Sequence, residues 1–68
     1  MTLTQRDWEN IAAARLGEHA LAVKVTMHTS RVHIDVTPEA GKAVVCANAM
    51  RALVSDYASD VRVTWLTV

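Results

Sequence analysis

Residues 21–37, LAVKVTMHTSRVHIDVT, decide the fold of this 68-residue chain. Apolar and polar residues alternate strictly on both sides of Thr29 and Ser30, which predicts two strands, each with one apolar and one polar face. Since so few residues separate them, the strands form an antiparallel hairpin, closed either by a two-residue turn or by a four-residue loop from His28 to Arg31.

The register of the hairpin follows by counting back from the turn, and it is the same for both kinds of connection. Val25 comes to lie opposite Ile34 on the inner face, and Lys24 opposite Asp35 on the outer face, where opposite charges attract. The apolar parity, which we expect to face the core, comprises Leu21, Val23, Val25, Met27, Val32, Ile34 and Val36.

A helix over residues 5–16 is predicted before the hairpin. Thr4 is a typical N-cap residue, and Asp7 stands three residues later, where the acid of a capping box lies. Trp8 falls on the apolar face of this helix and is expected to anchor the core. Gly17 can supply the left-handed residue that ends the helix.

The segment Thr37-Pro38-Glu39 predicts the start of a second helix. It combines an N-cap residue, a proline at the first helical position and an acid near the positive end of the helix. This helix should run to about Tyr57. Its apolar arc, which should pack on the sheet, comprises Ala43, Cys46, Met50, Leu53, Val54 and Tyr57.

A third strand is predicted from Val61 to Val68, a segment rich in β-branched residues. The order of elements is then α-β-β-α-β. Its simplest packing is an α+β two-layer sandwich, with both helices on one face of a three-stranded sheet and residues 1–68 in one small domain. The pattern leaves open whether the last strand lies beside the first or the second.

Composition narrows the classes of function. Seven basic and seven acidic residues give a formal net charge of zero, so the basic excess typical of nucleic-acid binders is absent. The apolar runs are too short for a membrane helix, residues 1–8 lack the features of a secretory signal, and the lone Cys46 cannot form an internal disulfide. We therefore expect a cytoplasmic protein without a membrane span.

Three side chains on the outer parity of the hairpin suggest a metal site at first sight. His28, His33 and Asp35 are a ligand set that zinc or iron accepts. The neighbouring cations Lys24 and Arg31 oppose a metal ion, and Lys24 already pairs with the carboxylate. We therefore expect solvated strand histidines and no metal.

Nucleophilic catalysis is not indicated either. Cys46 lies in the apolar arc of the second helix with no histidine at a helical neighbour position, which is typical of a buried structural thiol. Gly17 and Gly41 are the only glycines, so a glycine-rich phosphate cradle is absent. The sequence predicts a protein that is not an enzyme and needs no cofactor.

The outer face of the predicted sheet is the best candidate surface for a partner. It carries mixed charge and lacks the aromatic residues on which RNA-binding sheets stack bases. A protein partner therefore fits better, and nucleic acid bound by Lys24, Arg31 and Arg62 is the alternative. The candidate partner-binding residues are Lys24, Thr26, His28, Arg31, His33, Asp35, Arg62, Thr64 and Leu66.

The last strand offers a second mechanism of binding. At an edge of the sheet, its unpaired backbone and β-branched composition can pair with a strand of a partner. The same strand of a second copy can serve as that partner, which gives a homodimer. The sequence thus predicts a small non-enzymatic protein-binding module that acts through its open sheet face and its terminal edge strand.

The order of elements resembles that of the BON module. The likeness lies in the alternating hairpin of residues 21–36, the alanine-rich second helix and the closing VRV of residues 61–63. The resemblance implies a shared topology and the phospholipid or partner binding associated with that family. The chain departs from the family pattern at Thr29-Ser30 and at Asp60, where BON modules carry glycines.

In size and chemistry the chain is also similar in kind to small phage-encoded inhibitors, anti-CRISPR proteins among them. Such inhibitors occupy a surface of a host complex and need no catalytic residues. This analogy makes a small inhibitor of a host complex the second hypothesis for the function.

Overall fold

The first helix begins where the sequence predicts it. The computed structural model describes residues 3–57 and 60–66, and α1 spans Gln5–Leu16. The Asp7 N–H donates to Thr4 Oγ1 (3.1 Å) and the Thr4 N–H donates to Asp7 Oδ2 (2.9 Å), so the predicted capping box is confirmed. Gly17, with a φ of 57°, ends α1 and opens the short 3₁₀ turn η1, Gly17–His19.

The hairpin has the predicted register. β1 (Ala20–Met27) and β2 (Val32–Pro38) are antiparallel, and Val25 pairs with Ile34. The connection is the longer of the two predicted ones, residues 28–31, and the His28 N–H donates across it to the Arg31 carbonyl oxygen (2.8 Å).

The start of β1 departs from the predicted alternation. The pairing with β2 is irregular between Ala20 and Ala22, where the extra residue Leu21 forms a bulge. Leu21 was predicted to face the core and is instead 60% exposed. A bulge shifts the parity of the residues on one side of it, which is why strict alternation misplaces this side chain.

The second helix begins later than predicted. α2 spans Ala43–Tyr57, so the prediction that Thr37-Pro38-Glu39 starts it is wrong. Thr37 and Pro38 instead continue β2 and pair with the start of β1. Pairing across the sheet outweighs the local helix signal, and a proline is tolerated because it is the last residue of the strand. A turn through Gly41, whose φ is 80°, then leads into α2.

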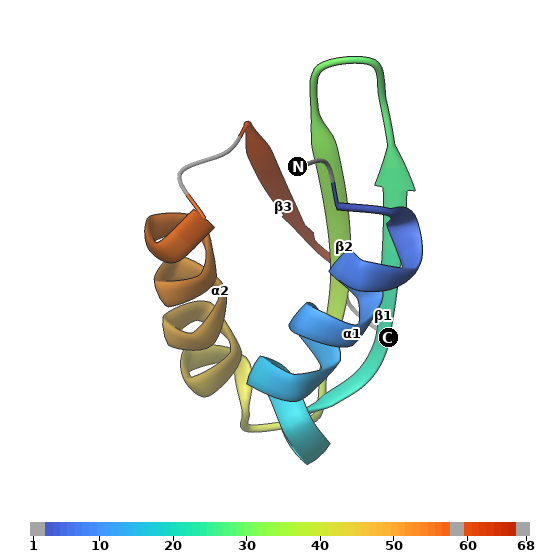
Figure 1. Ribbon diagram of the computed structural model, residues 1–68. Coiled ribbons are helices and arrows are strands. Elements are labelled where there is room, and N and C mark those ends of the chain that lie inside the picture. The colour runs from blue at the N-terminus through green and yellow to red at the C-terminus, as the bar shows by residue number, and fades with distance from the viewer. Residues whose placement is uncertain (1–2, 58–59, 67–68) are drawn as a thin grey trace.

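The third strand lies beside the second. β3 (Val61–Trp65) runs parallel to β2, and the strand order is β1-β2-β3, so β1 and β3 form the two edges of the sheet (Figure 1). The sequence left this neighbour open. The predicted strand continues to Val68, but residues 67–68 lie outside the described part of the chain.

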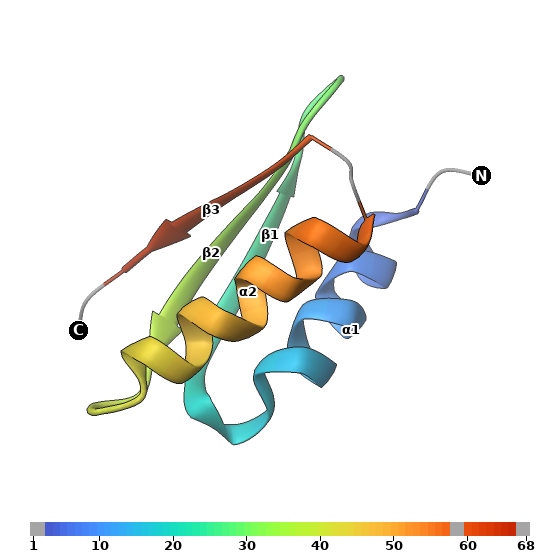
Figure 2. The same cartoon turned by 90° about the vertical axis from the view of Figure 1, so that its left-hand side faces the viewer.

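Both helices lie on one face of the sheet, as predicted for a two-layer α+β fold (Figure 2). The α1 helix packs closely against β1 and α2. The buried core between the layers comprises Trp8, Ala12, Leu16, Val25, Val32, Ile34, Val36, Cys46, Met50 and Leu53. Neither of the described helices is both long and apolar enough to cross a membrane.

Candidate functional site

Six of the predicted partner-binding residues lie in two rows across the outer face of the sheet. The strand pairing aligns the first row as Thr26, His33 and Arg62, and the second as Lys24, Asp35 and Thr64. Lys24 and Arg62 are exposed, whereas the other four are half-buried. The structure therefore brings these residues together, but presents mainly the two cations to solvent.

His33 links β2 to β3 at the centre of this face. Its Nε2 lies 2.5 Å from Thr64 Oγ1 and 3.2 Å from Asp35 Oδ1. The His33 and Asp35 side chains are only 30% and 23% exposed. Their polar groups already contact one another, so a partner on the outer face would have to compete with these contacts.

Two further predicted residues, His28 and Arg31, lie in the loop of the hairpin. The His28 ring centre is 6.4 Å from that of His33, and Arg31 Nε is 3.8 Å from Asp60 Oδ2. Within residues 3–57 and 60–66, no group of three His, Cys, Asp or Glu side chains is placed to hold a metal ion. The positive charge of Arg31 is partly neutralised by Asp60, which weakens the attraction of this side chain for a phosphate.

Cys46 is fully buried in α2. Its thiol donates to the carbonyl oxygen of His19 (3.2 Å), and burial raises the pKa of the thiol above its ordinary value. The raised pKa keeps this side chain in its protonated form and disfavours the thiolate, which is the reactive form. Cys46 therefore packs as part of the core.

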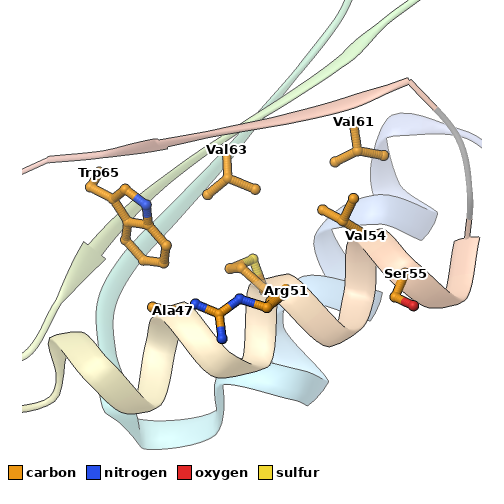
Figure 3. Close-up of a pocket in the computed structure, with 8 residues that line it drawn as sticks. Ala47, Arg51, Val54, Ser55, Val61, Val63 and Trp65 are labelled. Atoms are coloured by element: carbon orange, nitrogen blue, oxygen red, sulfur yellow. The ribbon is translucent and has the colours of Figure 1, made fainter.

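Sequence reasoning missed an open groove between α2 and β3. The groove has a volume of about 520 Å³, and Figure 3 shows the Trp65 side chain reaching from β3 toward Ala47 of α2. Trp65 is 43% exposed. The groove is lined by Ala47, Met50, Arg51, Val54, Ser55, Val61, Val63 and Trp65.

The apolar surface continues to the amino end of α2. A second hollow of about 380 Å³ shares Ala47 and Trp65 with the groove. Its remaining lining residues are Pro38, Ala43, Val44 and Leu66. Leu66, a predicted partner-binding residue, therefore lines this second hollow beside the groove and does not lie with the other residues of the outer sheet face.

The backbone of β3 is bonded to β2 at both ends of the strand. The Val32 N–H donates to the Asp60 carbonyl oxygen (2.9 Å), and the Leu66 N–H donates to the Val36 carbonyl oxygen (2.8 Å). These two bonds fix which backbone groups of β3 face β2.

The intervening residues follow by alternation. The backbone groups of successive strand residues point to opposite sides, so those of Arg62 and Thr64 point toward β2. The N–H and C=O groups of Val61, Val63 and Trp65 point away from β2, along the edge of the sheet. We call this edge together with the groove the open flank.

One signal in the sequence pointed to the open flank. Trp65 shares its parity with Val61 and Val63, so the last strand carries three apolar side chains on its inner face. Whether a helix covers them depends on where α2 sits, and local patterns do not reveal that.

Comparison with known proteins gives no match to a family model, to a curated protein or to a solved structure. The likeness to the BON module is therefore one of element order.

Proposed function

We propose that this protein is a non-enzymatic binding module that takes up an extended segment of a partner protein as a fourth strand beside β3. The observation that carries the proposal is the meeting of a free strand edge with an apolar groove. Val61, Val63 and Trp65 direct their backbone groups outward, and their side chains line the groove. In strand addition, backbone hydrogen bonds supply affinity and side-chain pockets supply specificity.

The opposite edge of the sheet lacks this combination. There α1 packs on β1, and Val25 on the inner face of β1 is buried. The bulge at Leu21 also interrupts the start of that strand. Natural proteins use such bulges to discourage pairing at an edge, which favours β3 as the receiving strand.

The outer-face residues of β3 itself would form the second contact of the added strand. Side chains of an added strand alternate between the two faces of the sheet, so some of them lie next to Arg62 and Thr64. Both are among the partner-binding residues predicted from the sequence, and they would border the proposed site.

Two proline variants test the proposal. Val63→Pro removes an N–H that points away from β2, so it blocks the free edge while leaving the β2–β3 hydrogen bonds intact. Val23→Pro is the matched control at the other edge. The backbone groups of Lys24 face Asp35, so those of Val23 point away from β2.

The ligand for the test comes from random heptapeptides displayed on phage and selected on the immobilised protein. The Kd of a selected, fluorescently labelled peptide is then measured by anisotropy with each variant. We expect Val63→Pro to weaken binding by about tenfold or more, and Val23→Pro to bind within about twofold of the wild type.

Three results would contradict the proposal. They are unchanged affinity in Val63→Pro, an equal loss in both proline variants, and selection that yields no peptide binding below about 1 mM. Circular dichroism of each variant shows whether the fold is retained.

A further inference from the structure

Among residues 3–57 and 60–66, the charged side chains of the open flank are of one sign. Arg51 is the charged residue among those lining the groove, and Arg62 projects from the opposite face of β3. Both are exposed. Among the described residues, neither forms an ion pair with an acid.

The acids nearest in sequence are already engaged. Asp56 of α2 accepts a hydrogen bond from Arg15 (2.6 Å), and Asp60 lies 3.8 Å from Arg31. The open flank is therefore positive although the whole chain has a formal net charge of zero.

The Arg51 guanidinium has N–H donors that its hydrogen bond to Asn48 does not use. Its Nη1 donates to Asn48 Oδ1 over 3.3 Å, and Figure 3 shows the guanidinium beside the groove, on the α2 side. A guanidinium carries five N–H donors in a planar fork that matches a carboxylate. A carboxylate on an added strand is thus the natural partner for this side chain.

Each face of an added strand would meet one of the two arginines. Its side chains alternate between the groove, where Arg51 lies, and the outer face, where Arg62 lies. We propose that the partner segment is acidic, with β-branched residues for the groove and at least one carboxylate on each face. This inference rests on the proposed strand addition at β3 and specifies its ligand.

A second copy of this chain fits the site less well. Its own edge, residues 61–66 (VRVTWL), contains Arg62 and no acid. Two copies paired through β3 would therefore bring two further arginines to an edge that is already positive. An acidic segment of a different protein removes that repulsion and pairs both guanidinium groups.

Three synthetic peptides of equal length test the inference. Each has eight residues, valine and threonine with two variable positions three residues apart, so that one variable side chain points to each face. The variable residues are glutamate, glutamine or lysine. We expect the glutamate peptide to bind about tenfold more tightly than the glutamine peptide, and the lysine peptide to bind most weakly.

Charge reversal in the protein supplies the matched test. In the double variant Arg51→Glu/Arg62→Glu, the order of the peptides should invert, so that the lysine peptide binds best. Arg6→Glu, which changes an exposed arginine on α1 away from the flank, should keep the original order. Val63→Pro should weaken binding of each peptide by about tenfold or more.

The outcomes separate this inference from the proposed function. Three peptides that bind within about twofold of one another, or an order unchanged by the double variant, overturn the acidic ligand while sensitivity to Val63→Pro keeps strand addition. Failure of all three peptides to bind up to about 1 mM overturns the acidic ligand, whereas strand addition is then decided by the selected peptide and its sensitivity to Val63→Pro. Two further results would also overturn the acidic ligand, because each assigns the β3 edge to a different occupant. One is a single-stranded oligonucleotide that displaces the glutamate peptide with higher affinity. The other is a dimer in sedimentation that Val63→Pro dissociates.

Discussion

The two edges of the sheet differ in how their inner faces are covered. At the β1 edge, α1 packs directly on the strand, and its residues Trp8, Ala12 and Leu16 are at most 3% exposed. At the β3 edge, α2 leaves a groove, and Trp65 of β3 is 43% exposed. Figure 2 shows the two helices below the sheet with β3 on the side of α2.

This contrast separates stability from binding within a very small chain. The closed β1 side supplies much of the buried core. A domain of this size buries little apolar surface, so its stability depends on keeping that core intact. The β3 side keeps apolar side chains and backbone groups in reach of a partner. Substitutions at the two edges should therefore change different measurements.

The largest expected effect is on the closed side. Leu16→Ala removes a side chain that is 1% exposed, and the resulting cavity should lower the free energy of unfolding by about 3 kcal/mol. Urea denaturation followed by circular dichroism measures this change. A loss below about 1 kcal/mol would show that α1 is not packed as tightly as the contrast requires.

Two proline variants of β3 should differ in their effect on stability, and the larger of the two effects is the next largest expected. Thr64→Pro removes an N–H that points toward β2, which leaves a carbonyl oxygen of β2 without its donor, and it also removes the hydroxyl that contacts His33 Nε2. These losses together should cost about 2 kcal/mol of unfolding free energy. Val63→Pro, one residue earlier, should cost less than about 1 kcal/mol because its N–H points outward. Equal urea midpoints for the two variants would contradict the orientation of β3.

The capping box of α1 should have a smaller effect, on the closed side. Thr4→Ala removes the hydroxyl that accepts the Asp7 N–H and should cost about 1 kcal/mol near neutral pH. Urea denaturation of the variant and the wild type measures the cost. Gln5→Ala, an exposed change in the same turn, is the control and should stay within about 0.5 kcal/mol of the wild type.

The cost of Thr4→Ala should also depend on pH. Hydrogen bonds from the Thr4 backbone and hydroxyl hold the pKa of Asp7 below its ordinary value. A carboxyl group whose pKa is lowered by folding stabilises the fold above its unfolded pKa, and that contribution is lost as the pH falls through the folded pKa. The difference between variant and wild type should therefore shrink in acid, and a difference that grows in acid would reverse the assigned sign.

The smallest expected effect on stability belongs to the largest exposed side chain. Trp65→Ala should change the free energy of unfolding by less than about 1 kcal/mol, because the indole is only partly covered. The same variant should weaken binding of the selected peptide by about tenfold, because the groove loses the largest side chain that lines it. A loss of stability as large as that of Leu16→Ala would place Trp65 in the core.

The sequence predicted the elements whose signals are local. Thr4 and Asp7 form the capping box within one turn of helix, and the alternation around Thr29 and Ser30 determines the hairpin register. These features depend on neighbours a few residues apart, so pattern and propensity suffice for them.

The features that the sequence missed depend on contacts distant along the chain. Thr37-Pro38-Glu39 satisfies the local rules for a helix start, but pairing with β1 keeps the first two residues extended. The parallel pairing of β3 and the distance of α2 from β3 likewise result from packing of the whole chain. The predicted outer-face residues do lie together. The groove was missed because the shared parity of Val61, Val63 and Trp65 does not show whether a helix covers them.

Amide hydrogen exchange in the isolated protein, followed residue by residue by NMR, tests the open flank most directly. We expect alternation along β3, with slow exchange at Arg62, Thr64 and Leu66, and fast exchange at Val61, Val63 and Trp65. Addition of a bound peptide should slow the fast set alone. Slow exchange at Val63 in the free protein, equal to that at Thr64, would show that the β3 edge is already paired and would contradict a free edge at β3.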